Sequence, residues 1–141
     1  MKRSVETLSG HKYDWKLPTK VIQGNNRKTS SYHKSAKELL QKEFPTVQIF
    51  EEVPILTDVL RTLYLDFYIP SFNLAVEIHG KQHYEFSSHF HGSRRKFLKA
   101  QANDRDKIAW CELNYIHIVV LSYKDSLEQW RENINNYEFY E

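Results

Sequence analysis

The sequence predicts a single α/β domain with a central mixed β-sheet flanked by helices. The 141-residue length suits one domain. A content of 40% hydrophobic and 14% aromatic residues is enough for a sizeable core. Segments with helix-like and strand-like patterns follow one another in the order α-β-β-β-α-β-α, which is typical of a sheet with helices packed on it.

The predicted elements follow from periodicity and from start and stop signals. A helix is expected at residues 30–45, where Ser30 or Ser31 can cap the start and Pro45 ends it. Three strands follow within residues 46–55, 58–70 and 72–80, the third almost continuously apolar and therefore central. A loop at 85–93, a long helix at 94–114, a buried strand at 115–123 and a closing helix at 126–140 complete the domain.

Residues 1–30 mix Pro, Gly, Asn and Ser without a helical or strand period, so we expect an irregular basic arm ahead of a domain at 31–141. Residues 1–37 hold nine Lys or Arg against two acidic residues, a charge of +7, and the remaining 104 residues carry −5. This asymmetry suggests contact with a polyanion, with Arg27 and Lys28 among the contacts; a solubilising tail is the alternative.

Composition also argues against several classes of protein. No apolar run approaches the ~18 residues of a membrane span, and the basic start lacks the apolar stretch of a secretory signal. The only cysteine, Cys111, cannot form an internal disulfide and fits a reducing compartment. We therefore expect a cytoplasmic protein that does not bind a membrane.

Two acidic residues, Asp66 and Glu77, interrupt apolar strands. Burying an unpaired carboxylate costs several kcal/mol, so such residues are usually paired, bound to metal or exposed at a strand end. Acids on hairpin-connected strands can converge, and hard oxygen ligands suit Mg²⁺ or Mn²⁺. The alternative is that both acids face solvent on an edge hairpin.

The residues after Glu77 strengthen the case for catalysis. His79 shares a strand face with Glu77, and Gly80 allows a sharp turn. That turn can bring the next three residues back over the site: Lys81, Gln82 and His83. Carboxylates with two nearby histidines meet the needs of phosphodiester hydrolysis, namely a metal, a base and charge stabilisation.

Asp66 followed by Glu77-x-His79 resembles the PD-(D/E)xK nuclease superfamily, with His in the usual Lys position. This variant is typical of the Vsr-like and EDxHD endonucleases, and the turn HGKQHY and the segment NDRDKIAWCELNYIHIVVLSY are similar to that branch. The resemblance covers roughly residues 31–123. It implies a restriction-endonuclease-like core and a metal-dependent DNA endonuclease. The short format resembles phage and mobile-element nucleases, which act in the cytoplasm of a bacterial or phage-infected host cell.

In this interpretation the two strand acids hold Mg²⁺ or Mn²⁺, with the backbone carbonyl of Ile78 as a further ligand. His79 or His83 acts as general base or stabilises the phosphate, and Gln82 positions the DNA strand. Lys81 is a candidate for the role of the missing lysine.

The family usually has a glutamate on the first helix. In this sequence more than one residue is a candidate for its role. Measured from Ala36 at about 100° per residue, Glu38 lies at about 200°, opposite the apolar stripe, whereas His33 lies at about 60°, beside it. Either His33 has replaced the acid, or the acid comes from Glu51 or Glu52.

On the long helix, Asp104 shares a face with the apolar positions, so we expect it to point towards the site and orient a histidine. An Asp104–Lys107 helix pair is the alternative. Four basic residues that open the same helix could bind phosphates, or form a solvated face: Arg94, Arg95, Lys96 and Lys99.

Two rival functions remain: a non-catalytic nucleic-acid-binding module with a nuclease-like fold, and a subunit that cuts only inside a larger recombination or transposition complex. The expected partner is DNA, and the sequence is compatible with a homodimer.

Overall fold

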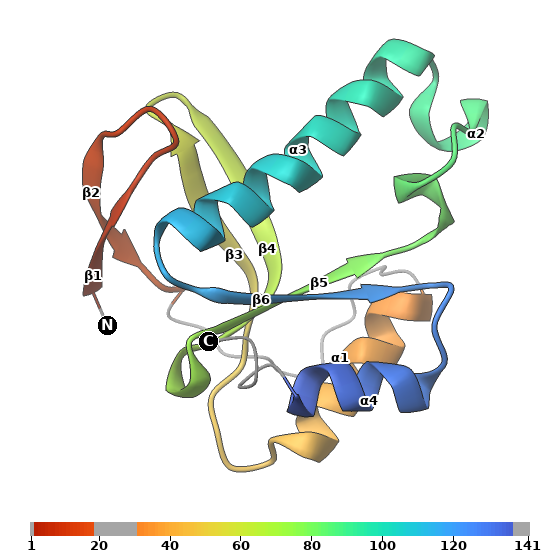
Figure 1. Cartoon of the computed structure of the whole chain (residues 1–141), viewed down its shortest axis with the longest axis horizontal. Coiled ribbons are helices and arrows are strands. Elements are labelled where there is room, and N and C mark those ends of the chain that lie inside the picture. Colours follow the sequence, from red (N-terminus) through yellow and green to blue (C-terminus); the bar gives the residue numbers. More distant parts are fainter. Residues whose placement is uncertain (1, 19–30, 137–141) are drawn as a thin grey trace.

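Four strands form one mixed sheet at the centre of the molecule (Figure 1). The computed structural model describes residues 2–18 and 31–136, and its sheet has the order β3-β4-β5-β6. Strands β3 (Phe50–Asp58), β4 (Arg61–Ile69) and β5 (Leu74–His79) pair antiparallel in turn, whereas β6 (His117–Ser122) runs parallel to β5. The expected α/β fold with a mixed sheet is therefore confirmed, and β5 is an interior strand, as its apolar run predicts.

Helices cover both faces of this sheet (Figure 1). α1 (Ser31–Glu43) and α4 (Leu127–Asn135) lie on one face, and α3 (Arg94–Leu113) lies on the other. Because β5 and β6 are parallel, the chain must cross over between them, and α3 makes this crossover. Short helices occupy the connections: η1 (Pro70–Phe72), η2 (Lys81–His83) and α2 (Ser88–His91), the last within the segment that was expected to be a loop.

The sheet separates two hydrophobic cores. Every second residue of β5 enters the core under α1 and α4: Leu74, Val76 and Ile78. Side chains of a strand point alternately to its two faces, so the residues between them face α3: Ala75, Glu77 and His79. Each core contains a buried tryptophan: Trp130 lies in the core under α1 and α4, and Trp110 lies in the core under α3.

The expectation of an irregular N-terminal arm is wrong for residues 2–16. Strands β1 (Lys2–Glu6) and β2 (Lys12–Lys16) form an antiparallel hairpin that packs on the core under α3. Trp15 is 3% exposed, lies edge-on to Trp110 at 5.1 Å between ring centroids, and its Nε1 donates to the carbonyl of Pro54 at 2.9 Å. Arg27 and Lys28 lie outside the described residues.

Candidate functional site

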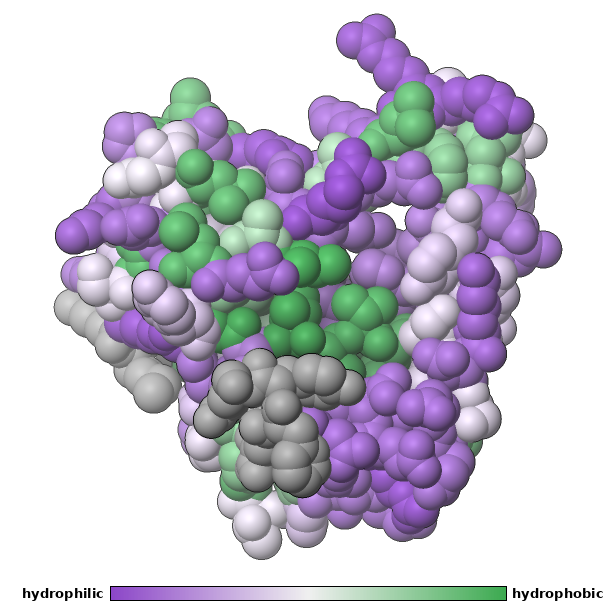
Figure 2. Space-filling model, viewed as in Figure 1, coloured by the Kyte–Doolittle hydropathy of each residue, from purple (hydrophilic) through white to green (hydrophobic). Residues whose placement is uncertain are grey.

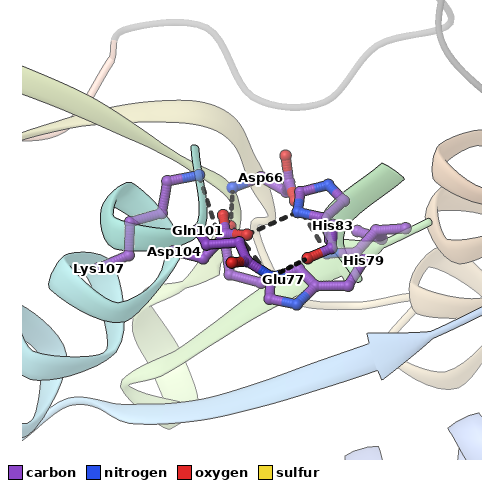
Figure 3. Close-up of polar contacts among 8 residues, drawn as sticks. Asp66, Glu77, His79, His83, Gln101, Asp104 and Lys107 are labelled. Atoms are coloured by element: carbon purple, nitrogen blue, oxygen red, sulfur yellow. Dashed lines mark hydrogen bonds and ion pairs between the residues drawn. The ribbon is translucent and has the colours of Figure 1, made fainter. Parts of the chain in front are cut away.

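The strand acids meet where the ladder between β4 and β5 opens. Its last pair is Phe67 with Val76, so the next residues, Asp66 and Glu77, stand opposite each other. There the side chains replace the ladder bonds: the backbone N–H of Asp66 donates to Glu77 Oε2 at 2.6 Å, and that of Ile78 donates to Asp66 Oδ2 at 2.8 Å (Figure 3). Each carboxylate is therefore held by the backbone of the neighbouring strand.

Glu77 is buried and forms an ion pair with α3. It is 1% exposed, and its Oε1 lies 2.9 Å from Lys107 Nζ. Burial, followed by the charge of Asp66, raises the pKa of Glu77 to about 8, with Lys107 opposing. Burial alone would lower the pKa of Lys107, but the nearby carboxylates, first Glu77 and then Asp66 and Asp104, together outweigh it and raise that pKa. One lysine thus faces two carboxylates, so the cluster lacks one positive charge when both acids are ionised.

Two histidines and Asp104 form a second cluster beside the acids (Figure 3). His83 Nδ1 lies 2.7 Å from Asp104 Oδ2, and His79 Nε2 lies 4.0 Å from Asp104 Oδ1. The two imidazoles stack at 4.4 Å between ring centroids with an interplanar angle of 4°. A carboxylate only accepts, so His83 donates from Nδ1, and in the neutral form of the ring Nε2 is then the acceptor.

The environment sets the charge of this cluster. Burial would raise the pKa of Asp104, but the hydrogen bond and the charge of His83 outweigh it and lower that pKa, so the carboxylate is ionised at neutral pH. Burial lowers the pKa of His79, with Asp104 opposing, which favours the neutral ring. Asp104 therefore orients His83 directly, as the helix-face argument predicts.

The turn after β5 is built as its sequence suggests. A Cβ at Gly80 would stand 2.7 Å from Gln82 Oε1, so the missing side chain leaves room for the Gln82 amide. His91 Nε2 donates to the Gln82 carbonyl at 2.8 Å, and Gln101 Nε2 donates to the His83 carbonyl at 3.4 Å. These contacts hold η2 against α2 and α3, and Gln101 and His91 were not foreseen in this role.

His33 belongs to a separate group around Glu51. Its Nε2 lies 2.9 Å from Glu51 Oε2, its ring lies 4.7 Å from that of Phe67, and Lys37 Nζ lies 3.5 Å from Glu51 Oε1. Phe67 points into the core under α1, on the face of the sheet opposite the Glu77 side chain. Glu38 is exposed, as the helical angles predict. The structure thus joins His33 with Glu51.

The basic residues lie at the surface near one end of the site. Figure 2 shows hydrophilic side chains projecting from the N-terminal end of α3, where four exposed cations gather: Arg94, Arg95, Lys96 and Lys99. The Arg94 guanidinium lies 4.7 Å from the centroid of the Phe86 ring. Lys81 is exposed and pairs with Glu85 at 3.4 Å, and Lys107, not Lys81, contacts the strand acids.

Lys107 corrects one alternative from the sequence. The sequence leaves an Asp104–Lys107 helix pair open as an alternative, but Lys107 forms its ion pair with Glu77. Asp106 lies outside the site and pairs with Arg61 at 2.6 Å. The helix face that carries Asp104 was therefore predicted correctly, and the partner of Lys107 was not.

Two viral proteins are similar to part of the chain. The chain is 36% identical to "Uncharacterized protein 307L" of Invertebrate iridescent virus 6 over 61 residues, which cover 43% of the chain and 31% of that protein. It is 39% identical to "Uncharacterized protein 094L" of Frog virus 3 (isolate Goorha) over 67 residues, 47% of the chain and 43% of that protein. The matches thus span less than half the length of each relative, and the names of both relatives state no activity.

No family model and no solved structure matches the chain. Within the described ranges, no helix combines the length and apolar character needed to cross a bilayer.

Proposed function

We propose that the chain is a metal-dependent DNA endonuclease with a restriction-endonuclease-like core. The observation that carries the proposal is the position of Asp66 and Glu77, opposite each other where two strands separate, beside a His83–Asp104 hydrogen bond of 2.7 Å. Perturbed carboxylates next to an oriented histidine are typical of acid–base sites. The basic start of α3 supplies cations that can contact a phosphate backbone.

The strand acids fit a hard divalent cation. Both offer oxygen donors, and each carboxylate oxygen keeps a lone pair beyond its present hydrogen bond. Burial is the larger cause of the raised pKa of Glu77 and the charge of Asp66 is the second, and a cation between the two acids would offset that charge. Asp66 and Glu77 would hold Mg²⁺ or Mn²⁺, which would supply Lewis acidity and neutralise charge on a scissile phosphate.

The chain's own groups account for proton transfer. With Asp104 accepting from Nδ1–H, His83 can take a proton from an attacking water at Nε2 and become an imidazolium. The ionised Asp104 carboxylate stabilises that imidazolium and holds the ring orientation. The ion pair with Lys107 fixes the Glu77 carboxylate between β5 and α3. The carboxylate is therefore already oriented before a substrate binds.

One observation favours the alternative of a non-catalytic DNA-binding module. Both oxygens of Glu77 are already engaged, one by Lys107 Nζ and the other by the N–H of Asp66. If these contacts exclude a metal ion, the chain would keep its fold and its basic surface without binding a metal. A subunit active only inside a larger recombination complex is a third proposal.

A substrate panel separates these functions. The wild-type chain is incubated with linear, nicked, branched and single-stranded DNA in Mg²⁺, Mn²⁺ or EDTA, and products are resolved on denaturing gels. We expect cleavage that requires the metal, and a loss on the order of 10²-fold or more in His83→Ala, the scale of a positioned acid–base group. DNA binding without cleavage on every substrate would favour the binding module.

A further inference from the structure

The cluster of His79, His83 and Asp104 has the donor set of a transition-metal site. Each residue offers one ligand atom, and these three atoms lie within 4.8 Å of one another. Two imidazole nitrogens and one carboxylate oxygen suit Zn²⁺ and its neighbours in the first transition row, whereas Mg²⁺ prefers oxygen ligands alone. The donor chemistry of this cluster therefore differs from that of the strand acids beside it.

We propose that His79, His83 and Asp104 bind one borderline divalent ion of the Zn²⁺ class, at a site separate from the Asp66–Glu77 pair. The proposal goes beyond the nuclease function, because binding does not depend on whether the chain cuts DNA. Three protein ligands leave at least one coordination position for water or an anion.

Binding requires the side chains to adjust. Zinc binds nitrogen and oxygen ligands at about 2.0–2.2 Å, so two of its ligand atoms stand about 3.3 Å apart in a tetrahedral site. Here His83 Nδ1 lies 2.7 Å from Asp104 Oδ2, His79 Nε2 lies 4.0 Å from the other oxygen, Oδ1, and the three ligand atoms lie within 4.8 Å of one another. The ion would replace the proton between His83 Nδ1 and Asp104, the ring's proton would then reside on Nε2, and the stacked rings would tilt so that both ligand nitrogens point to one centre.

The ligands sit on elements that are themselves fixed. His79 ends β5, and its carbonyl accepts from the N–H of Tyr123 at 2.9 Å. Asp104 lies inside the long helix α3, and His83 belongs to the turn that His91 and Gln101 hold. The side chains of His79, Asp104 and His83 are 10%, 15% and 26% exposed, so an ion can enter from the His83 side. A site supported in this way loses little entropy when it closes on an ion.

Occupation has a consequence that rests on the proposed function. An ion bound to His83 and Asp104 would stop Nε2 of His83 from accepting a proton. It would also take up the carboxylate of Asp104, which otherwise orients that ring. Zn²⁺ would therefore inhibit Mg²⁺-dependent cleavage, and a zinc chelator added in excess Mg²⁺ would restore it.

Cobalt provides the direct test, because Co²⁺ substitutes for Zn²⁺ and reports its ligands by visible absorption. The full chain is titrated with CoCl₂, then with ZnCl₂, and Zn²⁺ affinity is measured by calorimetry. We expect one equivalent of Co²⁺ with nitrogen-ligand absorption bands that Zn²⁺ abolishes. His79→Ala and the less disruptive His83→Gln should each weaken Zn²⁺ binding by on the order of 10² or more, since loss of an outer-shell contact alone costs about 10–100-fold.

Two controls locate the ion. His11→Ala removes an exposed histidine of the hairpin and should leave the affinity unchanged. Asp66→Asn should also keep it, and loss of binding in that variant would place the ion between the strand acids and overturn the proposal. Equal affinity in His79→Ala, His83→Gln and wild type, or no saturable Co²⁺ binding, would overturn it as well. None of these readouts uses cleavage, so failure here leaves the nuclease test unaffected.

Discussion

Replacing Asp66 by Asn should stabilise the metal-free protein and abolish its stabilisation by Mg²⁺. The substitution keeps the shape, and the amide oxygen can still accept the Ile78 N–H that now bonds Oδ2 at 2.8 Å. The change is one of charge, because Asp66 is, after burial, the second cause that raises the pKa of Glu77. Without that neighbour, the buried Glu77 carboxylate ionises at lower cost.

The magnitude follows from the pKa of Glu77, which rises from 4.5 to about 8. Burial is the larger cause, so we assign on the order of one pH unit, or about 1.4 kcal/mol, to Asp66. A folded pKa above the unfolded value means that the stability contributed by Glu77 is fully present below about pH 4.5 and is lost as the pH rises to about 8. The gain from Asp66→Asn should therefore be largest at about pH 8 and vanish below about pH 4.5.

Urea unfolding followed by tryptophan fluorescence measures both effects. At about pH 8 in EDTA, Asp66→Asn should exceed wild type by about 1 kcal/mol in free energy of unfolding. At a Mg²⁺ concentration 100 times its Kd, wild type should gain about 2.7 kcal/mol and the variant almost nothing, so the order reverses. Asp125→Asn, at an exposed position, is the control and should change neither value. An equal Mg²⁺ gain in Asp66→Asn, or a less stable variant in EDTA, would refute the metal-site reasoning.

Three further experiments test other parts of the molecule. Trp15→Ala should lower the free energy of unfolding by about 3–5 kcal/mol, the usual cost of deleting a buried tryptophan. A loss below about 1 kcal/mol in urea unfolding would mean that the hairpin contributes little to the stability of the domain. Because His33 pairs with Glu51 beside Phe67, on the sheet face opposite the Glu77 side chain, His33→Ala should cost less in single-turnover cleavage than the roughly 10²-fold of a positioned acid–base group. Glu38→Ala should lose less than about twofold, and a loss on the order of 10² in either variant would assign that residue the first-helix role. Replacing Lys96 and Lys99 with Gln should lower the slope of log K against log salt by about two; an unchanged slope would assign these lysines to a solvated face.

Local periodicity explains what the sequence could predict. Alternation along β5 places Glu77 and His79 on one face, and the angle of about 100° per helical residue places Asp104 inward and Glu38 outward. These inferences depend only on the geometry of a single element, and the structure agrees with each of them.

The N-terminal hairpin could have been found but was obscured by composition. Residues 12–16 alternate polar and aromatic side chains, with Tyr13 and Trp15 between charged neighbours, which is a strand pattern. The basic charge and the turn residues that follow favoured an arm instead. What stabilises these strands is tertiary packing: Trp15 lies against Tyr68 and Trp110, with 4.8 and 5.1 Å between ring centroids. No pattern within residues 1–30 reports those contacts.

The partner of Lys107 shows a deeper limit of single-element reasoning. Asp104 and Lys107 are three residues apart on α3, which is the spacing of a helix pair. They nevertheless have different partners, one in β5 and the other in the turn that follows it. α3 returns along the sheet after β5, so Lys107 reaches Glu77 and Asp104 reaches His83 and His79, in reverse order. Three helical residues rise about 4.5 Å and two strand residues about 6.6 Å, so the two sets of side chains come nearly level. The site therefore depends on the register of α3 against β5, and one helical turn of slippage would exchange the lysine for the aspartate beside Glu77.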